Sequence, residues 1–353
     1  MKTEGFIKAG SFRKFKYILL LLFFVFFDVS AYEANASVTL GGGWKSDVDP
    51  SFSFRSASDI FNRSATRSSA TMLFSFEAGV QSEKESGFAF DLFLNGLISL
   101  QSVSNSVLDS GIEGGYIQLV NKNNIIAFIA GINNSSCDYR SMKSLYVDPY
   151  IAFSYLYAPD EIYAIFLRTG LSYYFSTSSL VEYLTGPSLF LEGGARFNFN
   201  ENAALDVFAG SSATFFKDQF ISYNRYEDVY YGELSIEGRY FSLYSGMNLF
   251  WEISSFSFPV SLKYIFSRSF DYDTHKIVYW SDVSIPSTIY EKVRIDSTIE
   301  FSAKISYDIN DNFSILAGYF LHKTFSNVGD DFGDYADYSR LAHTVSVEVS
   351  YEY

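Results

Sequence analysis

Cysteine, histidine, proline and methionine are scarce in this chain of 353 residues. It has one cysteine, Cys137, with three histidines, six prolines and four methionines. A single cysteine excludes an intramolecular disulfide and a Cys-based zinc cluster, and we interpret it as a lone thiol in a loop. Basic charge is also low, because 26 Lys and Arg stand against 40 Asp and Glu, a net charge of −14. This composition gives no electrostatic footprint for nucleic acid.

Long apolar runs are nearly absent, and the clear one lies close to the N-terminus. Residues 17–27 read YILLLLFFVFF and follow five basic residues. This run is too short for a membrane helix, which needs about 20 residues, and it is typical of the core of a signal peptide. Ala34-Asn35-Ala36 has the small-x-small cleavage pattern, and a cut after Ala31 is the alternative. We predict a signal peptide over 1–36 and an exported barrel domain over 37–353, with an uncleaved anchor as the other interpretation.

Alternation of apolar and polar residues fills the rest of the chain. Aromatic residues make up 19%, with 37 Phe and 28 Tyr, both of which favour strands. Residues 88–101 alternate throughout, and so does AHTVSVEVSYEY at 342–353. These patterns predict 14 strands. The tenth ends near residue 252, and its start is unclear. The other thirteen are 37–46, 70–81, 88–101, 111–120, 125–134, 145–157, 162–175, 187–199, 203–216, 258–267, 292–307, 313–325 and 341–353. Pro149 lies in the sixth expected strand, 145–157, and predicts either a bulge in that strand or a later start.

The connections between these segments alternate in length. Short polar ones occupy 82–86, 121–124, 158–161, 200–202, 253–255 and 308–312. Longer and more irregular ones are expected at 47–69, 103–110, 135–144, 176–185, 217–229, 270–289 and 326–339. Short turns on one side and long loops on the other are typical of a transmembrane barrel. We therefore predict an all-β, antiparallel, up-and-down transmembrane barrel of about 14 strands, within 12–16, and a secreted β-sandwich or β-helix is the alternative.

The last strand resembles that of the outer-membrane β-barrel proteins of diderm bacteria. The resemblance lies in Val345, Val347, Val349, Tyr351 and Tyr353, together with the signal peptide and the alternating strands. It implies a barrel in outer-membrane lipid, inserted by the barrel-assembly machinery that reads this strand. The family more often ends in Phe or Trp. Fourteen strands also resemble monomeric porins and long-chain fatty-acid transporters, and the Phe/Tyr/Ser-rich composition is similar to that of spirochaetal outer-membrane proteins.

The polar row of each strand is expected to line the lumen. The principal candidates are Glu77, Asp91, Arg168, Glu192, Arg196, Arg294, Asp296, Glu300 and Lys304, and Glu113, Asp206, Lys263, Glu348 and Glu352 belong to the same rows. One interpretation is a charged constriction that sorts ions or solutes, and the other is a set of ion pairs that fills the interior. The acidic excess predicts a mild cation preference if the lumen is open.

The leading function is therefore passive diffusion of small hydrophilic solutes or ions, with no cofactor and no metal. A surface or adhesion barrel that acts through its loops is the second hypothesis, and a fatty-acid-type transporter is the third. The sequence does not predict an enzyme: Asp47/Asp49 and Asp271/Asp273/His275 only faintly resemble an acid-protease site, and His343 and Ser346 fall on opposite faces of a strand. The acidic loops at 271–287 and 326–339 suit solvated surface loops better than a Ca²⁺ or host-ligand site.

Overall fold

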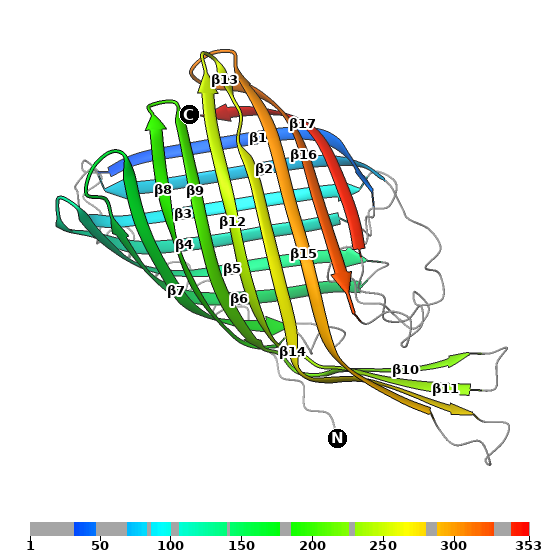
Figure 1. Ribbon diagram of the computed structural model, residues 1–353. Helices are drawn as coiled ribbons and strands as arrows, with labels where there is room; N and C mark the ends of the chain where they lie inside the picture. The colour runs from blue at the N-terminus through cyan, green and yellow to red at the C-terminus, as the bar shows by residue number, and fades with distance from the viewer. Residues whose placement is uncertain are drawn as a thin grey trace, which may run out of the picture.

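The computed structural model describes residues 32–46, 69–82, 86–99, 106–139, 142–176, 185–225, 230–279, 288–327 and 340–352, which form a closed barrel (Figure 1). The wall consists of β1 (Tyr32–Ser46), β2 (Ser69–Ser82), β3 (Gly87–Ser99), β4 (Ser106–Asn121), β5 (Asn124–Tyr139), β6 (Met142–Tyr157), β7 (Tyr163–Ser176), β8 (Gly186–Asn200), β9 (Ala203–Phe215), β12 (Arg239–Ile253), β14 (Val260–Tyr279), β15 (Thr288–Asp308), β16 (Phe313–Ser326) and β17 (Arg340–Glu352). No helix among the described residues is long and apolar enough to cross a membrane.

Each wall strand pairs antiparallel with the next, and β17 returns to β1. This closing ladder runs from Ser37 opposite Glu352 to Ser46 opposite His343. The predicted all-β antiparallel barrel of 14 strands is thereby confirmed. Closure leaves no open sheet edge in the wall, which is the condition for a β structure in lipid. The short connections lie at one end with the C-terminus, and we call this the turn end.

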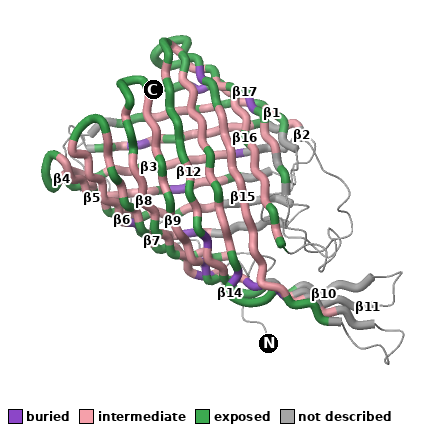
Figure 2. The backbone as a smooth tube through the Cα atoms, in the orientation of Figure 1, coloured by how far each residue is buried: buried purple, intermediate pink, exposed green. Residues whose placement is uncertain are grey.

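Many large apolar side chains of the wall are exposed, and by strand alternation they fall on its outer face. Exposed residues recur along the wall strands (Figure 2). Val345, Val347 and Val349 of β17 are all roughly half exposed. Exposed aromatic residues form two outward bands. Phe197, Trp251, Tyr307, Phe313 and Tyr351 lie toward the turn end, and Trp44, Tyr173, Phe175, Phe215, Phe270 and Phe325 lie toward the other end. An apolar surface between two aromatic girdles is the outer surface of a membrane barrel.

Inward aromatic rings lie over glycines of neighbouring strands. Tyr150 covers Gly131, and Tyr244 covers Gly210, where an added Cβ would come within 2.6 and 2.4 Å of the rings. Glycine lets the ring lie flat against the backbone because it has no side chain of its own. The aromatic residues of the polar rows therefore pack along the wall.

Four of the predicted irregular connections are wrong. Residues 106–110 belong to β4, residues 135–139 to β5 and residues 142–144 to β6. Residues in 217–229 and 270–289 also form strands. β10 (Gln219–Arg225) pairs with β11 (Tyr230–Ile236), and β11 pairs with β14 from Thr274 to Tyr279. The distal part of β15, from Thr288, completes a four-stranded sheet, which we call the flap. The flap projects beyond the barrel at the end opposite the C-terminus (Figure 1), and we call that end the flap end. Residues 271–279 are therefore strand and not loop.

The start of β1 and the ladder around Pro149 also differ from prediction. β1 begins at Tyr32, and its residues 32–36 pair with 78–82 of β2. At Pro149 the pairing of β6 with β5 is continuous, and the ladder with β7 lacks only the pairs of Asp148 and Pro149. A proline has no N–H to donate, so the gap lies on one side of the strand. Cys137 lies in β5 and not in a loop.

Candidate functional site in the lumen and at its rim

A row of polar side chains follows the inner wall from β3 to β16. We call it the charge belt, and it consists of Asp91, Glu113, Tyr150, Arg168, Glu192, Tyr244, Lys263, Glu300 and His322. Strand register brings these residues together. Asp91 is opposite Glu113, Arg168 is opposite Glu192, and Glu300 is paired with both Lys263 and His322.

The belt is acidic on β3 and β4. The Tyr150 hydroxyl donates a hydrogen bond to Glu113 Oε2. Asp91 faces Glu113 across the strand pair and is also within electrostatic range of Glu77 on β2. Like charges placed directly opposite each other on neighbouring strands repel. This sector therefore maintains a negative potential in the lumen.

Aromatic and basic groups alternate in the belt from β7 to β16. The Arg168 guanidinium lies 5.6 Å from the Phe190 ring centroid, and the Lys263 ammonium lies 4.8 Å from that of Tyr244. Tyr244 also hydrogen-bonds Glu192. His322 Nδ1 lies 3.4 Å from Glu300 Oε1. Each carboxylate of this sector lies beside a basic side chain, so its charge is nearly compensated.

Arg196 and Lys304 lie outside the belt, closer to the turn end. Arg196 makes two hydrogen bonds to Asp206, at 2.7 and 3.1 Å, so it does not join Arg168 and Glu192. Lys304 is opposite Gly318 and exposed. Glu77 and Asp91 are exposed as well, although they lie well inside their strands. Water therefore reaches the inner wall at several levels.

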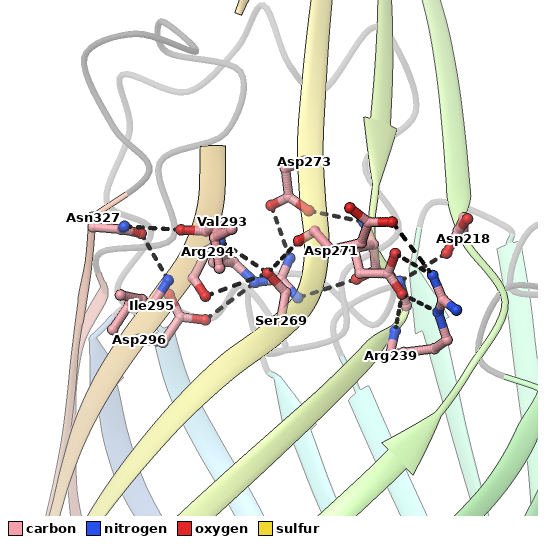
Figure 3. Close-up of polar contacts among 12 residues, drawn as sticks. Asp218, Arg239, Ser269, Asp271, Asp273, Val293, Arg294, Ile295, Asp296 and Asn327 are labelled. Atoms are coloured by element: carbon pink, nitrogen blue, oxygen red, sulfur yellow. Dashed lines mark hydrogen bonds and ion pairs between the residues drawn. The ribbon is translucent and has the colours of Figure 1, made fainter. Parts of the chain in front are cut away.

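A second polar cluster occupies the rim where the flap leaves the barrel (Figure 3). We call it the rim cluster, and it consists of Glu237, Arg239, Ser269, Asp271, Asp273, Arg294 and Asp296. Asp273 is 1% exposed, and its carboxylate accepts from the Glu237 amide at 2.8 Å and from Arg294 Nη1 at 3.4 Å. Arg294 Nε lies 3.3 Å from Asp296 Oδ2, so one guanidinium joins two carboxylates.

The rim cluster is built on a bulge in β14. The register with β15 shifts between Arg268 and Tyr272, and Ser269 accepts there from the Arg294 amide at 2.9 Å. Beyond this bulge, burial raises the pKa of Asp273, and Arg294 opposes the rise. The buried pair holds the first residues of the flap against the wall. The rim cluster therefore has a structural role, because it fixes the flap to the barrel wall.

The nine residues predicted for the lumen divide among these places. Asp91, Arg168, Glu192 and Glu300 lie in the belt with Glu77 beside it, Arg196 and Lys304 lie closer to the turn end, and Arg294 and Asp296 belong to the rim cluster. Tyr244, His322 and the buried Glu237 were missed. Alternation places Tyr244 and His322 in inward rows, but their charged neighbours depend on register. Glu237 carries no such signal, because it follows β11 without belonging to a strand.

The acidic and histidine groups considered for catalysis are separated or already paired. Asp273 is held by Arg294, and Asp271 points toward Arg239 at 3.9 Å. His343 bonds Tyr319 on the outer face, whereas Ser346 bonds Glu348. Asp47, Asp49 and the side chain of His275 are outside the described part of the chain, as are 280–287 and 328–339. Among the described residues, no group of three or more His, Cys, Asp and Glu is placed to hold a metal ion.

Solved structures of outer-membrane channels are similar to this chain in general architecture. The anion-selective porin from Comamonas acidovorans has a TM-score of 0.43 at 8% identity, covering 92% of this chain and 99% of that one. The DcaP channel of Acinetobacter baumannii has a TM-score of 0.42 at 9% identity, covering 92% and 98%. A channel from Pseudomonas putida F1 has a TM-score of 0.40 at 7% identity, covering 91% and 95%. No family model and no curated protein sequence matches.

Proposed function

We propose that this barrel is a porin-like channel of the outer membrane for passive diffusion of small hydrophilic solutes or ions. The observation that carries the proposal is the exposure of Glu77, Asp91 and Lys304, which are charged, inward and well within the wall. Charged groups reach water there only if the lumen is hydrated. An apolar outer surface combined with a hydrated, charged inner wall is the arrangement of a diffusion channel.

Conductance of the purified barrel in a planar bilayer tests this proposal. We expect discrete open steps in KCl and a reversal potential that favours cations in a KCl gradient. The cation preference follows from Glu77, Asp91 and Glu113 on β2–β4, which form no ion pair with another described residue. A folded barrel that stays silent, with binding of an external ligand by the flap, would support the surface-protein hypothesis instead. We propose no catalytic role.

We also propose that the last strand is read by the barrel-assembly machinery. Support comes from the outward row Val345, Val347, Val349 and Tyr351, which is exposed and ends at the turn end. Tyr353, which lies outside the described residues, is the next member of this alternation in the sequence. Tyr353→Ala is expected to lower the amount of barrel inserted in cells while leaving the melting temperature of refolded protein unchanged. Equal insertion of both proteins would count against this role.

The signal peptide is proposed to end at Ala31. A cut after Ala36, the other pattern in the sequence, would remove five residues of β1 that pair with 78–82 of β2. Cleavage after Ala31 keeps that ladder complete, because β1 begins at Tyr32. Mass spectrometry of the protein from outer membranes is expected to find Tyr32 as the first residue. A mature chain that begins at Ser37 would contradict this.

A further inference from the structure

The outward rows of the wall strands carry very little charge. Among the described side chains in these rows, the charged ones are Arg239, Arg268 and Lys323, and all three are basic. They lie on β12, β14 and β16, which form one sector of the wall together with β15. The outward rows of β1 to β9 contain no charged side chain that the structure describes. The outer surface therefore has a single basic sector.

Arg239 is neutralised by acids, whereas Arg268 is not. Arg239 Nη2 donates to Glu237 Oε2 at 2.9 Å and lies 3.9 Å from Asp271 Oδ2. Arg268 is exposed and forms no ion pair or hydrogen bond with another described residue. Its partners in the strand register are apolar, Phe241 on β12 and Ile295 on β15. The positive charge of Arg268 is therefore available to a group outside the protein.

Lys323 is the second outward cation without an acidic partner. It is opposite Ile299 on β15 and Leu341 on β17, and it forms no ion pair with another described residue. Its ammonium lies 5.0 Å from the centroid of the Phe325 ring. Phe325 follows two residues later in β16 and is closer to the flap end. The ammonium group therefore points along the outer surface toward the flap end, as a lysine does when its head lies at a membrane interface.

β15 separates these two residues, which we call the outer cations. Arg268 is opposite Ile295 and Lys323 is opposite Ile299, so they lie four residues apart along the strand and on either side of it. These offsets correspond to about 16 Å between their Cα atoms. The two side chains are therefore too far apart to share one small anion, and each can pair with a separate anionic group.

The outer cations lie at the level of the aromatic band of the flap end. Phe270 and Phe325, each two residues closer to the flap end than a cation, are 54% and 51% exposed. Such bands mark the interface between hydrocarbon and lipid headgroups. A basic side chain on the lipid face is costly at the bilayer centre and tolerated near this interface. The groups that face the outer cations there are lipid headgroups.

We propose that Arg268 and Lys323 bind the phosphate groups of anionic lipids in the leaflet at the flap end. The guanidinium fork of Arg268 matches phosphate oxygens, and the Lys323 ammonium pairs with phosphate as a point charge. The site continues the apolar outer surface of the wall, so the acyl chains of the same lipids lie against β14 to β16. Anionic lipid is thereby held on one side of the barrel, whether or not the lumen conducts.

Native mass spectrometry of the barrel folded in detergent tests the lipid site. The barrel is titrated with dioleoylphosphatidylglycerol, which is anionic, or with dioleoylphosphatidylcholine, which has the same acyl chains and no net charge. We expect the wild type to bind the anionic lipid more tightly. Arg268→Gln and Lys323→Gln are each expected to lower that affinity about fivefold, and the double variant is expected to lose the preference.

Two further variants serve as controls. Arg268→Lys keeps the charge and is expected to retain the preference for the anionic lipid. Lys122→Gln makes the same charge change in the exposed turn after β4 at the turn end, and we expect it to bind both lipids like the wild type. Melting temperatures equal to that of the wild type show that the variants are folded, because the outer cations form no ion pair with another described residue.

Three results would overturn the lipid site. The wild type could bind both lipids equally, or the double variant could keep the preference of the wild type. Displacement of the anionic lipid by an equal concentration of soluble glycerol 1-phosphate would assign the outer cations to a free phosphate compound instead of a lipid. None of these results depends on conductance, so the proposed channel function is tested separately.

Discussion

Burial separates two aspartates that lie two residues apart at the rim. Asp273 is 1% exposed and held by Arg294 and the Glu237 amide, whereas the Asp271 side chain is 61% exposed. Removal of one partner from a buried ion pair costs about 3–5 kcal/mol because the other charge stays buried. Asp273→Ala is therefore expected to lower the free energy of opening of the flap by about that amount, measured by hydrogen exchange of the β11 amides.

The matched control is Asp271→Ala. Its ion pair with Arg239 is long and exposed, and such pairs contribute little to stability. Its exchange rates are expected to stay close to those of the wild type. Equal loss of protection in the two variants would show that the rim cluster is not a buried joint.

Gly43 lies in the ladder between β1 and β17 that closes the barrel, where a single added carbon atom would not fit. A Cβ on Gly43 would lie 2.3 Å from the Val345 carbonyl oxygen, which belongs to the backbone of β17 and cannot rotate away. Overpacking of this kind costs about 1–3 kcal/mol. Gly43→Ala is expected to lower the urea midpoint of the barrel in lipid vesicles. Gly114→Ala, whose Cβ would have 3.6 Å to its nearest neighbour, is expected to unfold like the wild type.

At the scale of the element, the sequence predicted which face of a strand each residue occupies, but it did not predict how long the strands are. Residues 88–101 and 341–353 alternate with a single period, so the face of each residue follows from its number. The distal parts of β14 and β15 were taken for loop. β11, which pairs with the distal part of β14, lies some 40 residues away from it in the sequence, and a local pattern carries no information about such a contact.

The flap is an appendage to the ring of wall strands. β10 and β11 pair with each other and with the distal part of β14, and neither contributes to closure between β9, β12 and β14. Replacement of residues 219–236 by a short Gly/Ser linker is therefore expected to leave the melting temperature and the open conductance of the barrel within a few per cent of wild type. Loss of folded barrel in vesicles would show that the flap supports the wall.

At the scale of the whole molecule, charge is distributed by sector. Glu77, Asp91 and Glu113 lie on β2–β4, whereas the cations of the charge belt lie on β7 to β16 against aromatic rings and carboxylates. The double variant Asp91→Asn/Glu113→Gln removes two charges that no described basic side chain compensates. Its reversal potential in a KCl gradient is expected to move toward that of chloride. Neutralisation of Glu201, outside the lumen, is expected to leave the potential unchanged, and equal shifts would contradict the sector arrangement.

Alternation, turn spacing and composition by themselves determined that this protein is an antiparallel barrel of 14 strands, and which row of each strand is polar. These properties are local, because a pleated strand places successive residues on opposite faces. The tertiary structure alone decided which acids are neighbours, where Arg196 and Arg294 find their partners, and that a flap extends the wall. Those properties depend on register between strands, and register is set by contacts between residues far apart in the sequence.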